Sequence, residues 1–210
     1  MSRLSSYGRF RATWEDPGEA LAYRENRFSR SRRWRWTDRR ERVIVSRFLA
    51  SMGRPALGLD LPCGAGRLSV CFLETGHGWL GVDASLAMAR LARSSASGPA
   101  LVADATALPF RDRTFPFLVS VRLLHRIQEP GSRMLILREL ARVSKGPILL
   151  TYYTRWNLRG IQRWLRGKHP GLSLGEIRAE IQEAGLSIRQ AMALRRLTQQ
   201  QWFFVVQEAK

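Results

Sequence analysis

Residues 56–67 read ALGLDLPCGAGR, a short apolar run that leads into a loop with two glycines. The apolar part, 56–61, is expected to be a buried β-strand because it is short and continuously hydrophobic. Gly64 and Gly66 lack a Cβ atom, so the backbone can approach a ligand closely there, and the helix expected at 66–75 can face it with its N-terminus. This strand–loop–helix unit predicts a nucleotide-type pocket.

Short apolar runs continue to alternate with helical stretches after this unit. Strands of this kind, separated by helices, predict a parallel sheet that is covered on both faces. The predicted fold class is α/β, a Rossmann-like doubly wound sheet of seven strands with a C-terminal antiparallel hairpin and additional N-terminal helices. Ser173 is expected to cap the last helix and Gly185 to end it. The expected strands are 56–61, 78–82, 100–103, 115–123, 147–152, 187–194 and 201–207, and the expected helices of this part are 66–75, 86–94, 133–143, 158–166 and 174–184.

Residues 1–54 are expected to form a basic helical extension, a lid over the cofactor-binding domain of residues 55–210. They contain 14 basic and 6 acidic side chains. One helix is expected at about 19–27, and a second is expected to begin after Thr37, whose side chain can cap it. Between the two helices, 29–36 reads SRSRRWRW, a run of arginine and tryptophan.

Two aspartates follow the next two expected strands. In sheets of this class, ligands bind beyond the carboxyl ends of the strands, where the strand order reverses. Asp83 is suited there to accept hydrogen bonds from both hydroxyls of an adenosine ribose, and Asp104 from an adenine amino group. The glycine loop and Asp83 alone would equally suit NAD, but Ser69 stands where the dinucleotide fingerprint has its third glycine.

Residues 104–110, DATALPF, together with the expected fourth strand and Leu124-His125, resemble class I S-adenosylmethionine (SAM)-dependent methyltransferases. The similarity is to the small-molecule type, like the enzymes of ubiquinone and menaquinone biosynthesis, and it covers about 55–152. It implies methyl transfer with SAM as the cofactor. The glycine loop would hold the methionine part of SAM, the second-strand aspartate the ribose and the third-strand aspartate the adenine. The cofactor-binding residues that follow from the resemblance are Asp60, Pro62, Gly64, Gly66, Asp83, Asp104, Ala105 and Ser120.

Pro62 departs from the family, which usually has a glycine at that position. Proline fixes φ and has no N–H, so a hydrogen bond that the family can make from this position is absent. The departure leaves a weaker or degenerate SAM site open as an alternative.

His125 is the candidate catalytic base, because it follows the fourth strand on the side where the acceptor should lie. A structural histidine is the alternative reading. Arg122, Tyr152 and Trp156 are expected on the substrate side, Arg122 as a group that orients an anionic substrate. The three histidines are isolated and two cysteines cannot complete a zinc site, so no metal is expected.

The net charge of +18 comes almost entirely from arginine. Such a charge attracts anions, whether nucleic acid, anionic lipid or phosphorylated substrate, although part of the arginine excess can reflect genomic composition. Residues 151–168 contain five basic and no acidic side chains. Their pattern suits a basic amphipathic helix on an anionic membrane surface, or equally a helix that packs on the sheet.

Two functions stay open from the sequence. The first is methylation of a small or lipid-like substrate, anionic or presented at a membrane. The alternative is an RNA methyltransferase, or a catalytically silent RNA-binding relative, that stacks bases on tryptophan and holds phosphate with arginine. No secretory signal or spanning segment is visible, so the expected location is cytoplasmic, with peripheral contact to the inner membrane surface.

Overall fold

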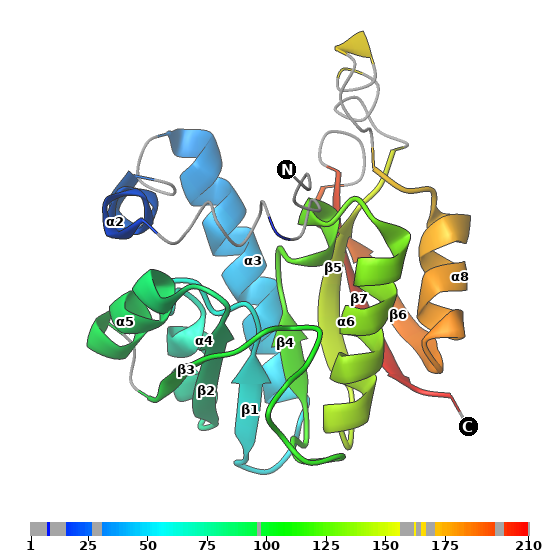
Figure 1. Cartoon of the computed structure of the whole chain (residues 1–210), viewed down its shortest axis with the longest axis horizontal. Coiled ribbons are helices and arrows are strands. Elements are labelled where there is room, and N and C mark those ends of the chain that lie inside the picture. Colours follow the sequence, from blue (N-terminus) through cyan, green and yellow to red (C-terminus); the bar gives the residue numbers. More distant parts are fainter. Residues whose placement is uncertain are drawn as a thin grey trace.

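The computed structural model describes residues 8, 16–26, 31–95, 98–155, 162, 165–166, 171–195 and 200–209. Seven strands form one sheet in the order β3-β2-β1-β4-β5-β7-β6 (Figure 1). The strands are β1 Leu57–Asp60, β2 Gly78–Asp83, β3 Ala100–Val102, β4 Leu118–Ser120, β5 Ile148–Tyr153, β6 Leu186–Ala193 and β7 Gln201–Glu208. The helices are α2 Pro17–Asn26, α3 Arg32–Ala50, α4 Ser69–Glu74, α5 Leu86–Ser95, the 3-10 turn η1 Leu124–Arg126, α6 Pro130–Val143 and α8 Leu174–Glu183.

The strand order confirms the predicted fold class. Strands β1 to β5 are parallel, and β7 inserts antiparallel between β5 and β6 as the C-terminal hairpin. The first strand, β1, lies in the middle of the sheet. The next two strands, β2 and β3, follow outward on one side, and β4 lies on the other side of β1. The order therefore reverses between β1 and β4, which is where a sheet of this class binds its ligand.

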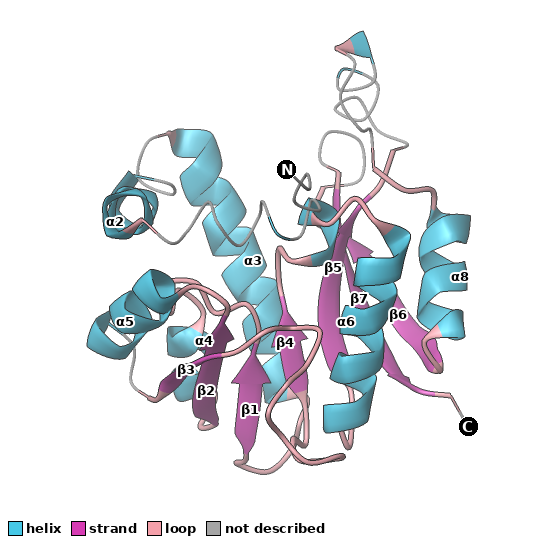
Figure 2. Ribbon diagram, in the orientation of Figure 1, coloured by secondary structure: helices cyan, strands magenta, loops and turns pink. Residues whose placement is uncertain are grey.

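Helices cover both faces of the sheet (Figure 2). On one face, α3, α4 and α5 share a hydrophobic core with Phe117 and Val119. On the other face, α6 and α8 share a second core with Leu118. Neighbouring residues of β4 thus enter different cores, because successive side chains of a strand point to opposite faces.

Gly58 allows β1 to lie directly against the ring of Phe117. A Cβ atom on this glycine would lie 2.0 Å from Cε2 of the ring. The ring also packs against Phe48 of α3 and His77 before β2, with ring centroids 6.5 Å and 4.8 Å away. The strand that leads into the glycine loop is therefore fixed from both β4 and α3.

The second N-terminal helix begins earlier than predicted. The helix α3 starts at Arg32, and the Ser31 side chain caps it by accepting the N–H of Trp34 at 3.3 Å. Thr37 lies inside the helix and is buried, so its prediction as the cap was wrong. Serine and threonine both cap well, and the local sequence does not rank them. The division of the chain after residue 54 stays a prediction.

Two elements beside the glycine loop are shorter than predicted. The helix α4 begins at Ser69, because Gly64 and Gly66 take φ values of 53° and 78° and form turns first. The strand β4 covers only Leu118–Ser120 of the predicted 115–123. Pro116 has no N–H to donate to a sheet, and the φ of 69° at Arg122 ends the extended conformation.

The remaining described strands and α-helices lie where predicted, with ends displaced by a few residues, whereas the 3-10 turn η1 was not predicted. Ser173 caps α8 and Gly185 follows its end with a φ of 77°, as expected. Most of the helix predicted at 158–166, with Trp156 and Trp164, lies outside the described residues. Among the residues that are described, no helix is long and apolar enough to cross a membrane.

Candidate active site

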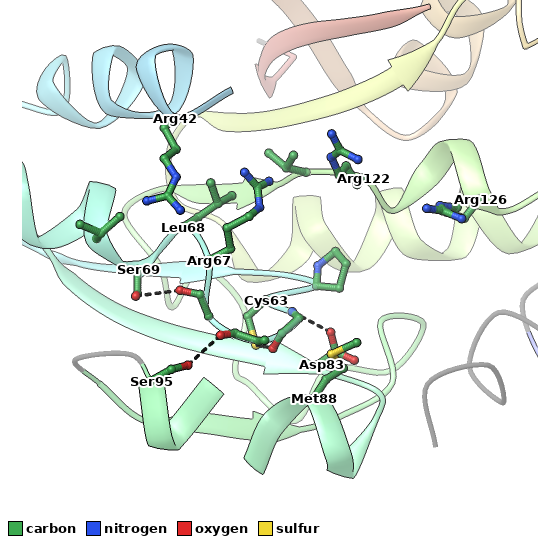
Figure 3. A pocket seen from close by; sticks show the side chains of 16 residues that line it. Arg42, Cys63, Arg67, Leu68, Ser69, Asp83, Met88, Ser95, Arg122 and Arg126 are labelled. Atoms are coloured by element: carbon green, nitrogen blue, oxygen red, sulfur yellow. Dashed lines mark hydrogen bonds between the residues drawn. The ribbon is translucent and has the colours of Figure 1, made fainter. Parts of the chain in front are cut away.

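A cavity of about 400 Å³ opens at the carboxyl ends of β1, β2 and β4 (Figure 3). Its volume falls within the range of about 300–1,000 Å³ that is usual for cofactor and small-molecule sites. The loop after β1, the ends of β2 and β4, and the helices α3 and α5 all contribute to it. The lining residues are Arg42, Pro62, Cys63, Gly64, Ala65, Gly66, Arg67, Leu68, Ser69, Val70, Asp83, Met88, Ser95, Val121, Arg122 and Arg126.

The main chain holds the glycine loop against the end of β2. Gly64 donates its N–H to Oδ2 of Asp83 at 2.9 Å, and Cys63 donates its N–H to the carbonyl of Val82 at 2.9 Å. The N–H of Ser85 donates to Oδ1 of Asp83 at 3.0 Å. Burial raises the pKa of Asp83, although these backbone donors oppose the rise. A Cβ atom on Gly64 would meet nothing within 4 Å, so the space above the loop is open to a ligand.

Asp60 is a completely buried carboxyl group at the end of β1. Its Oδ2 accepts a hydrogen bond from the indole N–H of Trp79 at 3.1 Å, whereas Oδ1 has no hydrogen-bond partner among the described residues. Burial raises the pKa of Asp60 to about 7, against the opposing effects of Trp79 and of the Arg67 charge. A buried acceptor without a donor, next to an open glycine loop, fits a ligand with a cationic amino group such as SAM.

The raised pKa of Asp60 predicts a loss of stability as the pH rises. Between pH 4 and 7 the folded chain holds a proton on Asp60 that the unfolded chain has released, so the free energy of unfolding falls through this window and is constant above it. From pH 5 to 8 the loss is at most about 3 kcal/mol. Urea unfolding of wild type and Asp60→Asn checks this, since the variant should lack this component of the pH dependence. Parallel pH curves for the two proteins would contradict it.

Four arginines line the pocket, and two of them are paired with carboxylates of α3 from outside that helix. Arg67 donates to Asp38 at 2.6 Å and to Glu41 at 2.8 Å, and both acceptors belong to α3. Arg122 at the end of β4 pairs with the same Glu41, and the other two arginines are Arg42 and Arg126. In Figure 3 Arg42, Arg67 and Arg122 lie on one side of the glycine loop and Asp83 on the other. The pocket therefore has a carboxylate side and a guanidinium side.

The structure brings Pro62, Gly64, Gly66 and Asp83 together at the cavity, whereas Asp60 is not among the lining residues. The roles of all five toward a cofactor stay predictions. Asp104 follows β3, and its Oδ1 accepts the N–H and the hydroxyl of Thr106 at 2.8 Å and 2.7 Å, so it shapes a turn beside the site.

Two other residues that the sequence placed at the cofactor belong to the opposite face of the sheet. Ala105 is buried in the core beneath α6. Ser120 is buried in β4, two residues from Leu118, which puts its side chain on the same face as that core. The roles of these residues and of Asp104 toward a cofactor stay predictions.

His125 and Tyr152 do not line the main cavity. Both border a separate space of about 50 Å³, in which the His125 ring stacks on Tyr153 with centroids 3.7 Å apart. The Tyr152 hydroxyl donates to Glu180 of α8 at 3.1 Å. The substrate-side placement of Tyr152 is therefore corrected, because its position in β5 directs it to the core of the other face. A catalytic role of His125 stays a prediction, without support from this geometry, and Trp156 lies outside the described residues.

Several residues of the pocket were not predicted from the sequence. Arg42, Arg67, Arg126, Met88 and Ser95 all line it. A signal for Arg67 was present, because it directly follows the last glycine of the loop. The others depend on how α3, α5 and η1 pack on the sheet, which no local pattern reveals. Within the described part of the chain, no group of three or more histidine, cysteine or acidic side chains is placed to hold a metal ion.

The fold and the pocket together define a class: a doubly wound α/β domain with a ligand site at the strand-order reversal. Residues 59–147 match the family model described as a methyltransferase domain. The chain therefore contains, over 59–147, a methyltransferase domain of the class I SAM-dependent type that the sequence resembles, and SAM is the methyl donor of that class.

The names of individual relatives refer to different substrates. The chain is 30% identical over 132 residues to the tRNA (carboxymethyluridine(34)-5-O)-methyltransferase of Saccharomyces cerevisiae. The aligned region covers 61% of this chain but only 45% of the yeast protein. The chain thus spans less than half the length of this curated relative. Magnesium protoporphyrin IX methyltransferase from Synechocystis PCC 6803 has the same fold, with a TM-score of 0.76, 16% identity, and 98% of this chain and 100% of that chain covered. A TehB-like SAM-dependent methyltransferase from Corynebacterium glutamicum aligns with a TM-score of 0.67 and 17% identity over 92% of this chain and 100% of that one.

Proposed function

We propose that this chain transfers the methyl group of SAM to a small or lipid-like anionic acceptor. One observation carries the proposal: a single cavity has the glycine loop and Asp83 on one side, and Arg122 and Arg126 on the other. The first side suits the adenosyl and methionine parts of SAM. The second side suits an acceptor with a negative charge.

When bound, SAM supplies a methyl group on a sulfonium, which an acceptor displaces in line. The residues of the chain then have to align the two molecules and exclude water. Asp83 would accept hydrogen bonds from the ribose hydroxyls, and Asp60 lies next to the loop that would hold the methionine part. Val121 and Arg122, at the end of β4, would border the acceptor.

Acceptor charge is the testable part of this proposal. Radiolabelled SAM should deliver methyl groups to anionic members of a panel of matched carboxylate and alcohol compounds in preference to their uncharged partners. Arg126→Met should weaken that preference by about tenfold, since it removes one charge-assisted contact. Exposed Arg113, which pairs with Glu208 away from the pocket, gives the matched control Arg113→Met. Methylation of the uncharged compounds alone would contradict the proposal.

RNA is the second candidate acceptor, and α3 gives the observation that favours it. Five arginines of its first half are exposed, namely Arg32, Arg33, Arg35, Arg39 and Arg40. The yeast relative that matches this chain is named for a tRNA substrate. If RNA is the acceptor, radiolabelled SAM should deliver labelled methyl groups to added tRNA. The affinity for RNA should also fall steeply as the salt concentration rises, because binding arginines neutralise phosphates. Labelled tRNA in the same panel would replace the small-molecule proposal.

The cytoplasmic location and the peripheral membrane contact stay proposals. The membrane contact rests on the charge of residues 151–168, most of which lie outside the described residues. Loss of binding to anionic vesicles in a Trp164→Asp variant would support the membrane contact, and unchanged vesicle binding would count against it.

A further inference from the structure

Three residues on one face of α3 point to the guanidinium side of the pocket. Trp34, Asp38 and Glu41 are spaced four and three residues apart, which places them above one another along a helix. The Trp34 ring lies 5.6 Å from the guanidinium carbon of Arg122. Asp38 and Glu41 both accept hydrogen bonds from Arg67. The helix α3 therefore contacts two arginines of the cavity lining, Arg67 and Arg122.

Glu41 is completely buried, and its carboxylate lies between two guanidinium groups. Its Oε1 and Oε2 accept from Nε of Arg122 at 2.8 Å and 3.1 Å, and Nη2 of Arg122 lies 2.6 Å from Oε1. Nη2 of Arg67 donates to Oε2 at 2.8 Å. Burial on its own would raise the pKa of Glu41, but the two arginines hold it below its usual value. The side chain is therefore an anion fixed between two cations.

Arg122 is held in a backbone conformation that arginine rarely adopts. Its φ is 69°, in the left-handed region, which is unfavourable for a residue with a Cβ atom. Its N–H donates to the Thr151 hydroxyl at 2.8 Å, and Glu41 fixes the other end of the residue. Strained residues of this kind persist where the surroundings determine them from several sides, and they gather at functional sites.

We propose that Glu41 is a positioning residue, which orients the Arg122 guanidinium so that it binds the anionic group of the methyl acceptor. The inference rests on the proposed function and names a residue for its acceptor side. Glu41 itself does not line the cavity, whereas Arg122 does. Glu41 therefore acts on the acceptor through Arg122.

The charge of the cluster agrees with an anionic ligand. Three arginines of this side, Arg42, Arg67 and Arg122, share only two carboxylates of α3, those of Asp38 and Glu41. Positive charge is thus left in excess on this wall, in a partly enclosed site where a charge-assisted hydrogen bond is strong. When one edge of a guanidinium pairs with a carboxylate of the same chain, the orientation of its planar group is fixed before a ligand binds.

Asp38 provides a matched control for Glu41. Each of the two carboxylates accepts one hydrogen bond from Arg67, but only Glu41 contacts Arg122. The variants Glu41→Gln and Asp38→Asn should therefore change the binding of S-adenosylhomocysteine (SAH) to a similar extent. Only Glu41→Gln should weaken the binding of an anion on the acceptor side.

The probe for that side is benzoate, titrated into the SAH-saturated 210-residue chain, with uncharged benzyl alcohol as its counterpart. We expect Glu41→Gln to raise the benzoate Kd about tenfold or more, and Asp38→Asn to change it less than about threefold. Benzyl alcohol should not distinguish the variants. In an Arg122→Met background, Glu41→Gln should have no further effect on benzoate, because its action passes through Arg122.

A second measurement keeps the proposal testable should Glu41→Gln fail to fold. In the NMR spectrum of wild type, the Nε–H resonance of Arg122 should shift as benzoate saturates the SAH complex. This resonance is assigned by its absence from the spectrum of Arg122→Met. Equal benzoate affinity in Glu41→Gln and Asp38→Asn, or an Arg122 signal that ignores benzoate, would overturn the positioning role. Failure of wild type to bind SAH would instead overturn the proposed function, so the two failures are distinguishable.

Discussion

Asp83→Ala is expected to abolish measurable binding of SAM and SAH. The carboxylate is buried and receives the N–H groups of Gly64 and Ser85, so it both shapes the loop and presents oxygen to the ribose side of the pocket. Two ribose hydroxyls on a charged acceptor contribute about 1.5–3 kcal/mol each. Their loss weakens binding by at least about a hundredfold, which calorimetry would register as no detectable heat.

Two controls separate this effect from general damage. Asp112→Ala removes a carboxylate whose partner is Arg142, far from the loop in the fold and largely exposed, and it should leave SAH affinity unchanged. Thermal melting of Asp83→Ala shows whether the chain remains folded. A folded Asp83→Ala protein that binds SAH as tightly as wild type would show that the ribose site lies elsewhere.

Glu180→Ala should lower the free energy of unfolding by about 3–5 kcal/mol, the usual result when a buried ion pair loses one partner. Glu180 of α8 accepts from Nε of Arg133 at 3.1 Å and 3.0 Å and from the Tyr152 hydroxyl at 3.1 Å. Arg133 is 4% exposed and also donates to the carbonyls of Ile127 and Gln128. Without Glu180, its charge stays buried and uncompensated. Urea unfolding measures the loss.

An exposed pair of the same chemistry gives the comparison. Arg113 and Glu208 lie 2.6 Å apart with side chains 59% and 69% exposed. Glu208→Ala should cost less than about 1 kcal/mol, because solvent screens such a pair. Equal losses for Glu180→Ala and Glu208→Ala would show that the buried pair has no special role in joining α6, α8 and β5.

The sequence was sufficient to predict the sheet, because its information is local. Each strand of the parallel core is a short apolar run, and Gly64, Gly66 and Asp83 stand where those runs end. Residues that follow parallel strands meet at one edge of the sheet, so the loop and Asp83 could be brought together without a structure. The hydrogen bond from Gly64 to Asp83 shows that they do meet.

The guanidinium side could not be predicted in the same way. Glu41 and Arg122 are 81 residues apart, and their contact depends on how α3 crosses the sheet. Tyr152 was misplaced because a one-residue difference along β5 exchanges the two faces of the sheet. The position of His125 after β4 could be predicted, but the turn η1, which stacks its ring on Tyr153, could not. Pro62 lines the cavity, and the weaker SAM binding that its missing N–H implies stays a prediction.

Calorimetric titration of the wild-type chain with SAH tests the central claim most directly. The cavity lined by the glycine loop and Asp83, with the buried carboxyl group of Asp60 at the end of β1, predicts saturable binding of about one SAH per chain at ligand concentrations below about 1 mM. Folded protein that shows no binding heat at about 1 mM SAH would contradict the account and leave a methyltransferase fold without its cofactor site.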